Sequence, residues 1–278
     1  MRARPQKRQG SRSRFAGKRS GAQKPQGARS PFAGKSTGSQ KRQDARPAFP
    51  RKRPRDASPP AIERLLARQD WERIRHLVKP FENGASALPR LREFCARVIA
   101  WNRTVSNLIS RNDEGRIVSR HLAESLEHAR WLGEGAGEDW LDFGSGAGFP
   151  AVPLAILGIG SRWTLVESRR IKSLFLRKTL GEMGIQEAMT VVNARLESVA
   201  ENGGRFAGFT ARAAGNLNEA LGNAANLVAP GGSAFLWKGS RWQTELEDRT
   251  WESAWRLVEH RPLVDSSVVV LKFLREAH

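Results

Sequence analysis

The chain has 278 residues, enough for one large α/β domain or two small ones with buried cores. Its formal net charge at pH 7 is +19, but the first 60 residues carry 18 Lys and Arg against two acidic residues. The remaining 218 residues carry 29 basic and 26 acidic side chains and are close to neutral. The composition therefore excludes a uniformly basic protein and indicates a basic N-terminal segment joined to a globular body.

The cysteine count and the hydropathy pattern bear on location. Cys95 is the single cysteine, so the chain cannot form an internal disulfide, and no His and Cys cluster has the spacing of a zinc site. No apolar run approaches the roughly 20 residues of a membrane-spanning helix, and the first 60 residues lack the apolar stretch of a signal peptide. We expect a cytoplasmic protein with no membrane segment and no bound metal. An organelle transit peptide is the alternative, disfavoured because the segment has no amphipathic helical period.

A similar unit recurs every 17 residues near the N-terminus, as RQGSRSRF at 8–15, PQGARSPF at 25–32 and RQDARPAF at 42–49. Each unit has one Phe and almost no aliphatic side chain, too little apolar surface for the stacked units of a solenoid. We expect residues 1–58 to form a disordered, basic, repetitive tail. Two interpretations stay open: a solvated extension that aids solubility, or a segment whose Lys and Arg neutralise RNA phosphates while its Phe residues stack on unpaired bases.

Residues 60–135 are predicted to form a small helical N-terminal subdomain, because apolar side chains recur there at three- and four-residue spacing. We expect two packed helices, separated at Pro89, and a third helical run that ends in the glycine-rich stretch 133–137. The apolar positions are Ile62, Leu65, Leu66, Ile74 and Leu77, then Leu91, Phe94, Cys95, Val98 and Trp101, and finally Ile117, Val118, Leu122, Leu126 and Trp131.

Strand and helix patterns alternate over residues 136–278. Such alternation predicts a largely parallel sheet covered by helices on both faces. In such a sheet a ligand binds beyond the carboxyl ends of the strands, here beside the first strand. The expected strands are 139–143, 162–166, 189–193, 206–211, 233–237 and 268–273, and the expected helices begin near Pro150 or span 169–183 and 216–228.

Three glycines, Gly144, Gly146 and Gly148, directly follow the first expected strand. Glycine permits positive φ angles and close approach of a ligand to the backbone, as a tight strand-to-helix turn at a binding site requires. The dinucleotide fingerprint GxGxxG needs glycine at 149, where this chain has Phe149, and no Lys-Ser or Lys-Thr pair completes a phosphate-binding loop. The pattern is GxGxG and argues against both of those nucleotide-binding loops.

Two acidic residues flank this loop in sequence. Asp142 stands two positions before it, and Glu167 stands about 20 residues after it, at the end of the second expected strand. The combination is typical of methyltransferases that bind S-adenosylmethionine, in which the second acid accepts hydrogen bonds from the ribose hydroxyls. The alternative is that the loop is only a tight turn and Glu167 a solvated strand end.

Further motifs, taken in chain order, resemble one methyltransferase family. They are RHLAESL at 120–126, DFGSGAGFPAVPLAI at 142–156, ESRRIKSLFLR at 167–177, NARLES at 193–198, ARAAGNL at 211–217, and PGG and WKG within 230–239. Between about residues 90 and 275 the chain resembles the RsmG family, also called GidB. The resemblance implies a Rossmann-like class I methyltransferase sheet. It also implies methyl transfer from S-adenosylmethionine to N7 of a guanine in 16S ribosomal RNA, at the position usually numbered 527.

The implied partner is small-subunit ribosomal RNA or the 30S particle, and we expect a monomer. Seven positions are expected to bind the cofactor S-adenosylmethionine: Gly144, Gly146, Phe149, Glu167, Leu196, Glu197 and Arg212. Leu196 is expected to pack on the adenine, while Glu197 or its backbone binds the polar edge of the base. Arg212 is expected to pair with the cofactor's carboxylate or an RNA phosphate, because its planar guanidinium suits both; a purely structural arginine is the alternative.

Arg120 and His121 are the positions at which the resemblance suggests contact with RNA. Guanine N7 has a free lone pair and carries no proton, so its attack on a sulfonium methyl group requires alignment and no general base. No catalytic residue is therefore assigned, and His121 is better explained as a hydrogen-bonded structural side chain. Phe149 and Trp101 are candidates for stacking on a splayed target base, although core packing explains either equally well.

The sequence departs from the family in two places. The family's WNxxxNLT element, expected to shape the RNA-facing side, appears as WNRTVSNLIS at 101–110, and the repetitive tail is not part of the family pattern. Two other functions are alternatives. A methyltransferase of small molecules or proteins would leave the basic tail unexplained. A non-enzymatic RNA-binding assembly factor predicts damage to the glycine loop or to the acid at 167, and the sequence shows neither.

If the tail binds RNA, deletion of residues 1–58 is expected to weaken RNA binding and to flatten its salt dependence. Each lost phosphate contact removes about 0.7 to 0.9 from the slope of log affinity against log salt concentration. Filter binding at several salt concentrations measures this slope. An unchanged slope would leave only the solubility interpretation.

Overall fold

The computed structural model describes residues 55–134, 137–202, 206–213 and 215–277, without the side chains of residues 200–202. Residues 1–54, which contain all three repeat units, lie outside the described residues, so the tail stays a prediction. Within the described ranges, no helix combines the length and the apolar character needed to cross a membrane.

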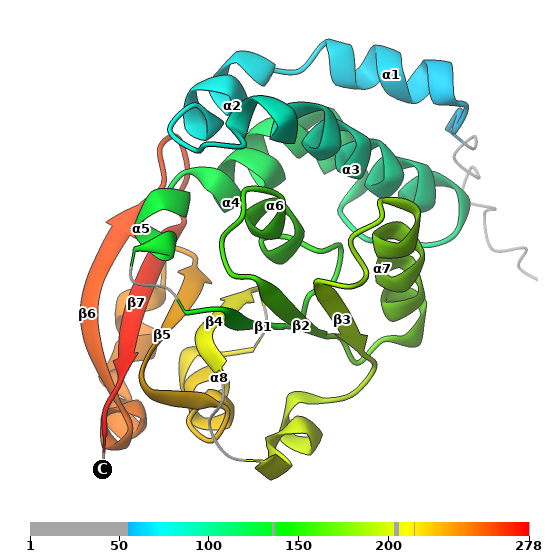
Figure 1. The fold of residues 1–278 in the computed structure, drawn as a ribbon. Helices are drawn as coiled ribbons and strands as arrows, with labels where there is room; N and C mark the ends of the chain where they lie inside the picture. The colour runs from blue at the N-terminus through cyan, green and yellow to red at the C-terminus, as the bar shows by residue number, and fades with distance from the viewer. Residues whose placement is uncertain (1–54, 135–136, 203–205, 214, 278) are drawn as a thin grey trace, which may run out of the picture. The chain divides into compact units, whose positions relative to one another are not determined.

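A seven-stranded sheet forms the core of the described body, in the order β3-β2-β1-β4-β5-β7-β6 (Figure 1). The first five strands along the chain are parallel, whereas β7 runs antiparallel to both β5 and β6. This confirms the expected Rossmann-like α/β fold. The strands are β1 (Asp139–Phe143), β2 (Arg162–Val166), β3 (Met189–Val192), β4 (Phe206–Arg212), β5 (Val228–Lys238), β6 (Trp255–Pro262) and β7 (Val269–Arg275).

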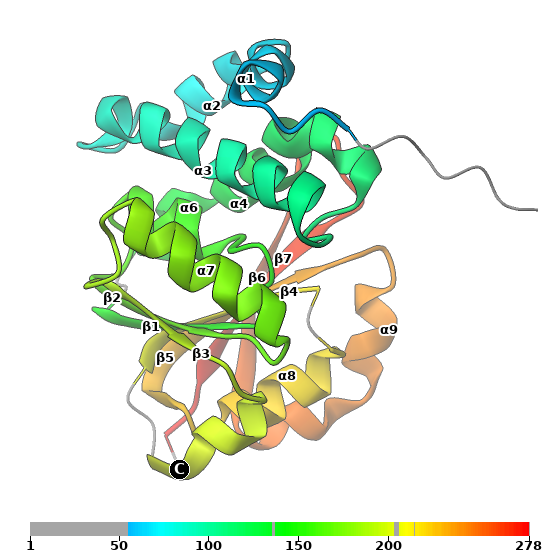
Figure 2. The same ribbon diagram turned by 90° about the vertical axis from the view of Figure 1, so that its right-hand side faces the viewer.

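Helices cover both faces of the sheet (Figure 2). Consecutive side chains of β1 point to opposite faces, so Trp140 belongs to one core cluster and Leu141 to the other. Burial on both faces explains why the central strands appear in the sequence as apolar runs. One face carries α3 (Gly84–Thr104), α6 (Ala151–Ile156) and α7 (Arg170–Glu182), and the other carries α8 (Leu217–Ala224), α9 (Trp242–Glu247), η3 (Leu196–Asn202) and η4 (Arg249–Ser253).

The C-terminal part differs from the sequence-based expectation. No strand was expected at β6, which lies at the edge of the sheet and pairs only with β7. An edge strand needs no continuous apolar run, and here exposed Arg256, Val258 and His260 alternate with more buried residues. The helix expected at 216–228 ends at Ala224, and β5 begins at Val228, before the Pro-Gly-Gly turn that was expected to precede it.

The N-terminal part has more helices than expected. Instead of one helix before Pro89 there are α1 (Pro59–Ala67) and α2 (Trp71–Val78), because the Asp70 carboxylate accepts hydrogen bonds from the backbone N–H groups of Glu72 and Arg73 and starts a new helix. Pro89 does not separate two helices: it lies in the second turn of α3, where its missing N–H costs a single intrahelical bond. The third run is divided into η1 (Arg111–Arg116), the π-helical turn η2 (Ile117–Leu122), α4 (Ala123–Leu126) and α5 (Ala129–Gly133).

The N-terminal helices and the sheet share one hydrophobic cluster. Leu91 and Phe94 of α3 lie in the same buried cluster as Trp140 of β1 and Phe235 of β5. The predicted boundary at residue 135 between a helical subdomain and a methyltransferase domain stays a prediction.

A buried carboxylate, Glu114 of η1, joins several segments of the helical part. Its side chain is 1% exposed and accepts hydrogen bonds from Arg103 Nε (2.9 Å), Asn102 Nδ2 (2.8 Å) and Arg55 Nη1 (3.0 Å). The Asn102 amide oxygen in turn accepts from the backbone N–H groups of Leu108 and Ile109. Burial raises the pKa of the Glu114 carboxyl, but these donors outweigh burial and lower it overall. Arg55, within the predicted tail, is thereby held against η1.

We predict that Glu114→Ala destabilises the fold by about 3 to 5 kcal/mol, because it leaves the nearly buried Arg103 guanidinium without its partner. The matched control is Glu72→Ala, which removes an exposed ion pair with Arg75 and should cost less than about 1 kcal/mol. Urea unfolding followed by circular dichroism measures both free energies. Equal, small losses for the two variants would contradict the role given to Glu114.

Candidate functional site

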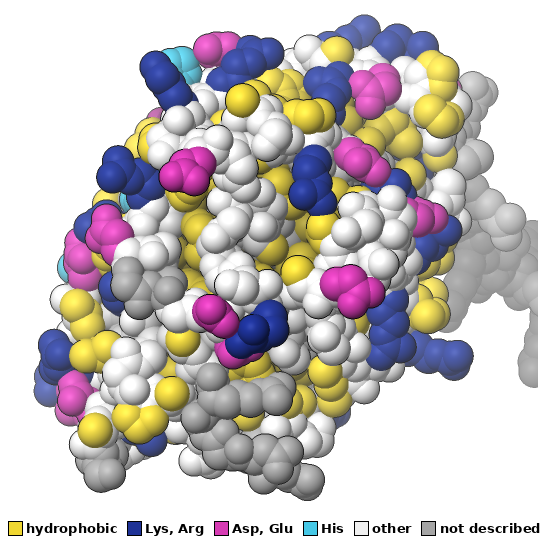
Figure 3. All heavy atoms as spheres, viewed as in Figure 1, with side chains coloured by type: hydrophobic (Ala, Val, Ile, Leu, Met, Phe, Trp, Pro, Cys, Tyr) yellow, Lys and Arg dark blue, Asp and Glu magenta, His cyan; other side chains and the backbone are white. Residues whose placement is uncertain are grey.

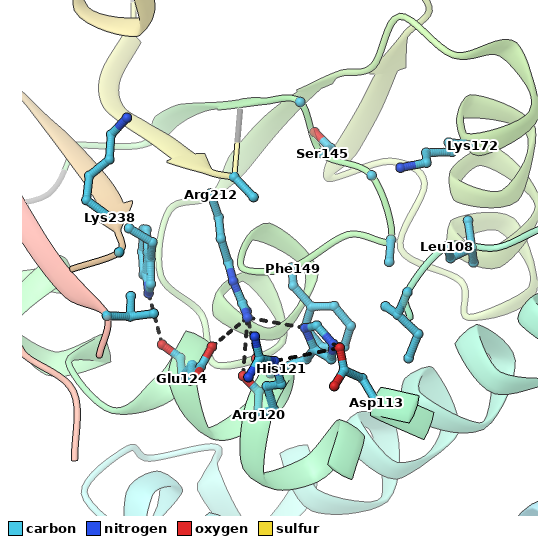
Figure 4. Close-up of a pocket in the computed structure, with 18 residues that line it drawn as sticks. Leu108, Asp113, Arg120, His121, Glu124, Ser145, Phe149, Lys172, Arg212 and Lys238 are labelled. Carbon is cyan, nitrogen blue, oxygen red and sulfur yellow. Dashed lines mark hydrogen bonds and ion pairs between the residues drawn. The ribbon is translucent and has the colours of Figure 1, made fainter. Parts of the chain in front are cut away.

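A cavity of about 380 Å³ lies at the carboxyl ends of β1, β4 and β5 (Figure 4). The loop 144–149, which follows β1, forms its floor, and residues 212–213 and 237–239 form one wall. Residues of the segment 108–124 form the opposite wall, and Lys172 of α7 lies at one side. This is the end of the sheet at which the sequence predicts a ligand.

The glycine loop turns tightly beneath the cavity. Gly144 and Gly146 have φ angles of +68° and +55°, which side-chain-bearing residues rarely adopt. Gly148 has a φ of +91°, and a Cβ there would lie 2.9 Å from a methyl group of Val152 and 3.1 Å from the ring of Phe94. The first two glycines therefore leave the floor open, while the third allows the loop to pack against α3 and α6.

Glu167 supports this loop from behind. Its buried carboxylate accepts hydrogen bonds from the backbone N–H of Gly146 at 2.9 Å and of Arg169 at 2.7 Å. It is not among the residues that line the cavity. Each carboxylate oxygen has a further lone pair that can accept a second hydrogen bond. Binding of ribose hydroxyls by Glu167 stays a prediction.

Asp142, at the end of β1, is also buried. Its Oδ1 accepts a hydrogen bond from Thr210 Oγ1 at 2.6 Å, and its Oδ2 has no partner among the described residues. Burial raises the pKa of this carboxyl to about 7, and the nearby charge of Glu167 adds to the increase. Its described contact therefore links β1 to β4 beneath the loop.

Arg212 joins the end of β4 to the helical wall of the cavity (Figure 4). Its Nη2 donates to Glu124 Oε2 at 2.6 Å and to the carbonyl oxygen of Arg120 at 3.2 Å, and its Nη1 donates to the carbonyl oxygen of His121 at 3.1 Å. The side chain is 14% exposed. These contacts give Arg212 a structural role, and any contact with a cofactor or RNA is a further prediction.

His121 packs on the loop below it. Its ring stacks on Phe149 with 5.4 Å between ring centroids, and its Nδ1 lies 3.2 Å from Arg212 Nη2. Burial, followed by the adjacent Arg212 cation, lowers the pKa of His121 well below its usual value, so the ring is neutral at pH 7. Nδ1 then accepts from Arg212, which leaves the N–H on Nε2. The neighbouring Arg120 side chain is half exposed at the cavity edge.

Other candidates lie outside the cavity. Leu196 is buried in the core cluster of the other face, and Glu197 is exposed. Their expected contacts with adenine stay predictions. Trp101 packs edge-on against Phe175 between α3 and α7 and does not line the cavity. Six of the nine predicted site residues do line it: Gly144, Gly146, Phe149, Arg212, Arg120 and His121.

Sequence reasoning missed four charged residues that line the cavity. Lys238 contacts Glu245 Oε2 at 2.7 Å, whereas the amino group of Lys172 has no partner among the described residues and points into the cavity (Figure 4). Glu124 pairs with Arg212, and Asp113 of η1 faces His121. Three of these four residues lie inside motifs that resemble the family, so the sequence could have marked them: Lys172, Lys238 and Glu124. No sequence pattern marked Asp113.

The described residues contain no cluster of three or more potential metal ligands.

A Rossmann-like sheet with an antiparallel β7 and a glycine loop beneath a cavity defines the class I methyltransferase fold. The model of one family, GidB, described as rRNA small subunit methyltransferase G, matches residues 87–268. The chain belongs to this family.

Relatives named "Ribosomal RNA small subunit methyltransferase G" agree with the family match. The protein from Halorhodospira halophila is 38% identical over 167 residues, which cover 60% of this chain and 77% of the relative. The protein from Paracoccus denitrificans is 29% identical over 189 residues, which cover 68% of this chain and 95% of the relative. Among solved structures, a putative methyltransferase, yhhF, from Escherichia coli is 21% identical with a TM-score of 0.46, covering 56% of this chain and 87% of that one.

We predict that Gly144→Asp abolishes binding of S-adenosylmethionine, because the new side chain would occupy the cavity floor. Aspartate tolerates a positive φ better than most residues, so the fold is expected to survive. Titration calorimetry with S-adenosylhomocysteine measures the loss. The control is Gly181→Asp, the same substitution at a glycine outside the cavity lining, where an added Cβ would meet no atom within 4 Å. Unchanged affinity in Gly144→Asp would place the cofactor elsewhere.

Proposed function

We propose that the chain transfers the methyl group of S-adenosylmethionine to N7 of a guanine in 16S ribosomal RNA, at the position usually numbered 527. The observation that carries the proposal is the match of the GidB family model to residues 87–268, a stretch that includes the glycine loop and all the residues lining the cavity. Membership of that family supports the coarser part, methylation of small-subunit ribosomal RNA. The choice of guanine N7 rests on the resemblance of the motifs.

The cavity suits the proposed cofactor. Gly144 and Gly146 form a floor without Cβ atoms, and Glu167 stands directly behind it. The cofactor, when bound, supplies a methyl group on a positively charged sulfur. In this proposal the two glycines lie against its methionine portion and ribose, Glu167 binds the ribose, Leu196 and Glu197 bind the adenine, and Phe149 packs against the bound molecule.

The proposed chemistry requires positioning and no proton transfer. The lone pair of guanine N7 attacks the methyl carbon while the carbon–sulfur bond breaks, and its electron pair stays on sulfur. Alignment of this kind supplies several kcal/mol, up to about 7 to 11. A neutral His121, held by Arg212 on one side and Phe149 on the other, fits a role in shaping the cavity better than one as a general base.

The proposed partner is small-subunit ribosomal RNA or the 30S particle, bound by a monomer in the cytoplasm. Arg120 at the edge of the cavity offers positive charge to RNA phosphates. On the face shown in Figure 3, basic and acidic side chains are interspersed and no single-sign field covers it. By the sequence, the strongest excess of positive charge that could attract RNA lies in the tail.

We predict that the purified chain labels small-subunit RNA with radioactive methyl groups from S-adenosylmethionine. Cleavage chemistry specific for 7-methylguanine, followed by primer extension, is expected to give one stop at one guanine. Both free 16S RNA and 30S particles are offered as substrates, and large-subunit particles and Gly144→Asp serve as negative controls. Label on another base would support methylation of small-subunit RNA but reject guanine N7 as the target. Label only on protein or small molecules would reject both.

A further inference from the structure

Asp113 presents an acceptor oxygen to the cavity that the described residues leave largely unused. Its Oδ1 accepts a hydrogen bond from Arg116 Nη2 at 2.6 Å. Its Oδ2 lies 3.6 Å from Arg120 Nε and 3.7 Å from His121 Nε2, beyond the roughly 3.2 Å of a good hydrogen bond. The side chain is only 12% exposed, and the residue lines the cavity (Figure 4).

Such an oxygen calls for a donor. A nearly buried carboxylate oxygen without good hydrogen bonds is unfavourable, because water no longer solvates it fully. His121 Nε2, the nearest neutral donor, is itself buried without a hydrogen-bond partner. The other carboxylate of the cavity, Glu124, is already engaged on both oxygens, by Arg212 and by Ser266 Oγ. Of the two carboxylates in the described lining, Asp113 is therefore the one with an oxygen that has no close donor.

Guanine has the matching chemistry. Its Watson–Crick edge places two donors side by side, N1–H and the 2-amino group, and a carboxylate only accepts hydrogen bonds. N7 lies on the other ring of the purine, so a base held by this edge leaves N7 uncovered. Adenine offers the carboxylate one donor, its 6-amino group, and turns the N1 lone pair towards it, which is the kind of mismatch that buried polar groups reject strongly.

The charge of Asp113 also favours the proposed reaction. Methyl transfer moves a positive charge from sulfur to the purine, and sulfur leaves as a neutral thioether. The purine N1–H becomes a stronger donor as that charge develops, so a hydrogen bond to a carboxylate is stronger in the transition state than in the ground state. Arg116 binds Oδ1, and Arg120 lies near Oδ2 without reaching hydrogen-bond distance, so Oδ2 stays accessible to a donor.

We propose that Asp113 is the specificity-determining residue that binds the Watson–Crick edge of the target guanine and so directs N7 towards the methyl group. The inference rests on the proposed function and adds the residue that distinguishes guanine from other bases. In this arrangement the substrate base lies against the helical side of the cavity, formed by residues of the segment 108–124, and the cofactor lies against the glycine loop.

The test compares wild-type enzyme with Asp113→Asn in single-turnover methylation. The substrates are 30S particles reconstituted with either guanosine or inosine at the target position. Inosine keeps N7, O6 and N1–H but lacks the 2-amino group. Wild-type enzyme is expected to prefer guanosine by about 10-fold or more, and Asp113→Asn to lose about 10- to 100-fold in kcat/KM on guanosine, as expected for loss of a hydrogen bond to a charged group. The variant is also expected to lose most of the preference for guanosine over inosine.

The control variant Arg116→Ala removes the exposed partner of Oδ1 and leaves Oδ2 in place, so it is expected to keep the guanosine preference. Calorimetry with S-adenosylhomocysteine is expected to give unchanged affinity in both variants, which also shows that they fold. The inference is overturned if Asp113→Asn retains the full preference, or if its activity loss follows a loss of cofactor affinity. Absence of labelling by wild-type enzyme would overturn the proposed function and the inference together, whereas a fully active Asp113→Asn would overturn only the inference.

Discussion

The site depends on the guanidinium of Arg212, which joins the end of β4 to the helical segment on the other side of the cavity. An arginine side chain stays charged and offers five donors, so its burial at the end of β4 requires acceptors close by. The helical segment supplies them as two backbone carbonyl oxygens, the His121 ring nitrogen and the Glu124 carboxylate. The cavity is the space enclosed when the helical wall meets the sheet through these contacts. In a sheet with only its own loops, the glycine floor would have no opposite wall.

The helical wall is in turn fixed by a second buried charge. Glu114 binds Asn102, and Asn102 holds the backbone of the residues that line the cavity at 108 and 109. The same carboxylate binds Arg55, which therefore lies beside η1, the element that also carries Asp113. The element in which this chain departs from its family, WNRTVSNLIS, thus contains the residues that set the position of the wall.

The sequence predicted the parts of the molecule that local chemistry determines. The glycine loop follows from its spacing after an apolar strand, and the five parallel strands follow from burial on both faces. Edge strand β6 was missed because half of its residues face solvent, and α2 was missed because its boundary depends on one capping carboxylate, Asp70. Asp113 and the pairing of Arg212 were beyond sequence reasoning for a different reason. Their contacts form only when the chain is folded: Arg212, for example, pairs with Glu124, which lies 88 positions away in the sequence. The spacing of residues along the chain does not predict such contacts.

Under the proposed function, the charges in and around the cavity favour different places for the phosphate backbone and the base of the substrate RNA. Arg120 is half exposed at the edge, where a phosphate can reach it without losing all of its water. Asp113 and Glu124 lie deeper, and carboxylates there repel a phosphate but favour a sulfonium and a purine that gains positive charge. A nucleotide that enters the cavity therefore lowers its electrostatic energy most when its backbone stays at the rim and its base points inward. The buried cations of the lining, Arg212 and Lys238, do not reverse this preference, because each is already paired with a carboxylate. This is the orientation that methylation of a base requires.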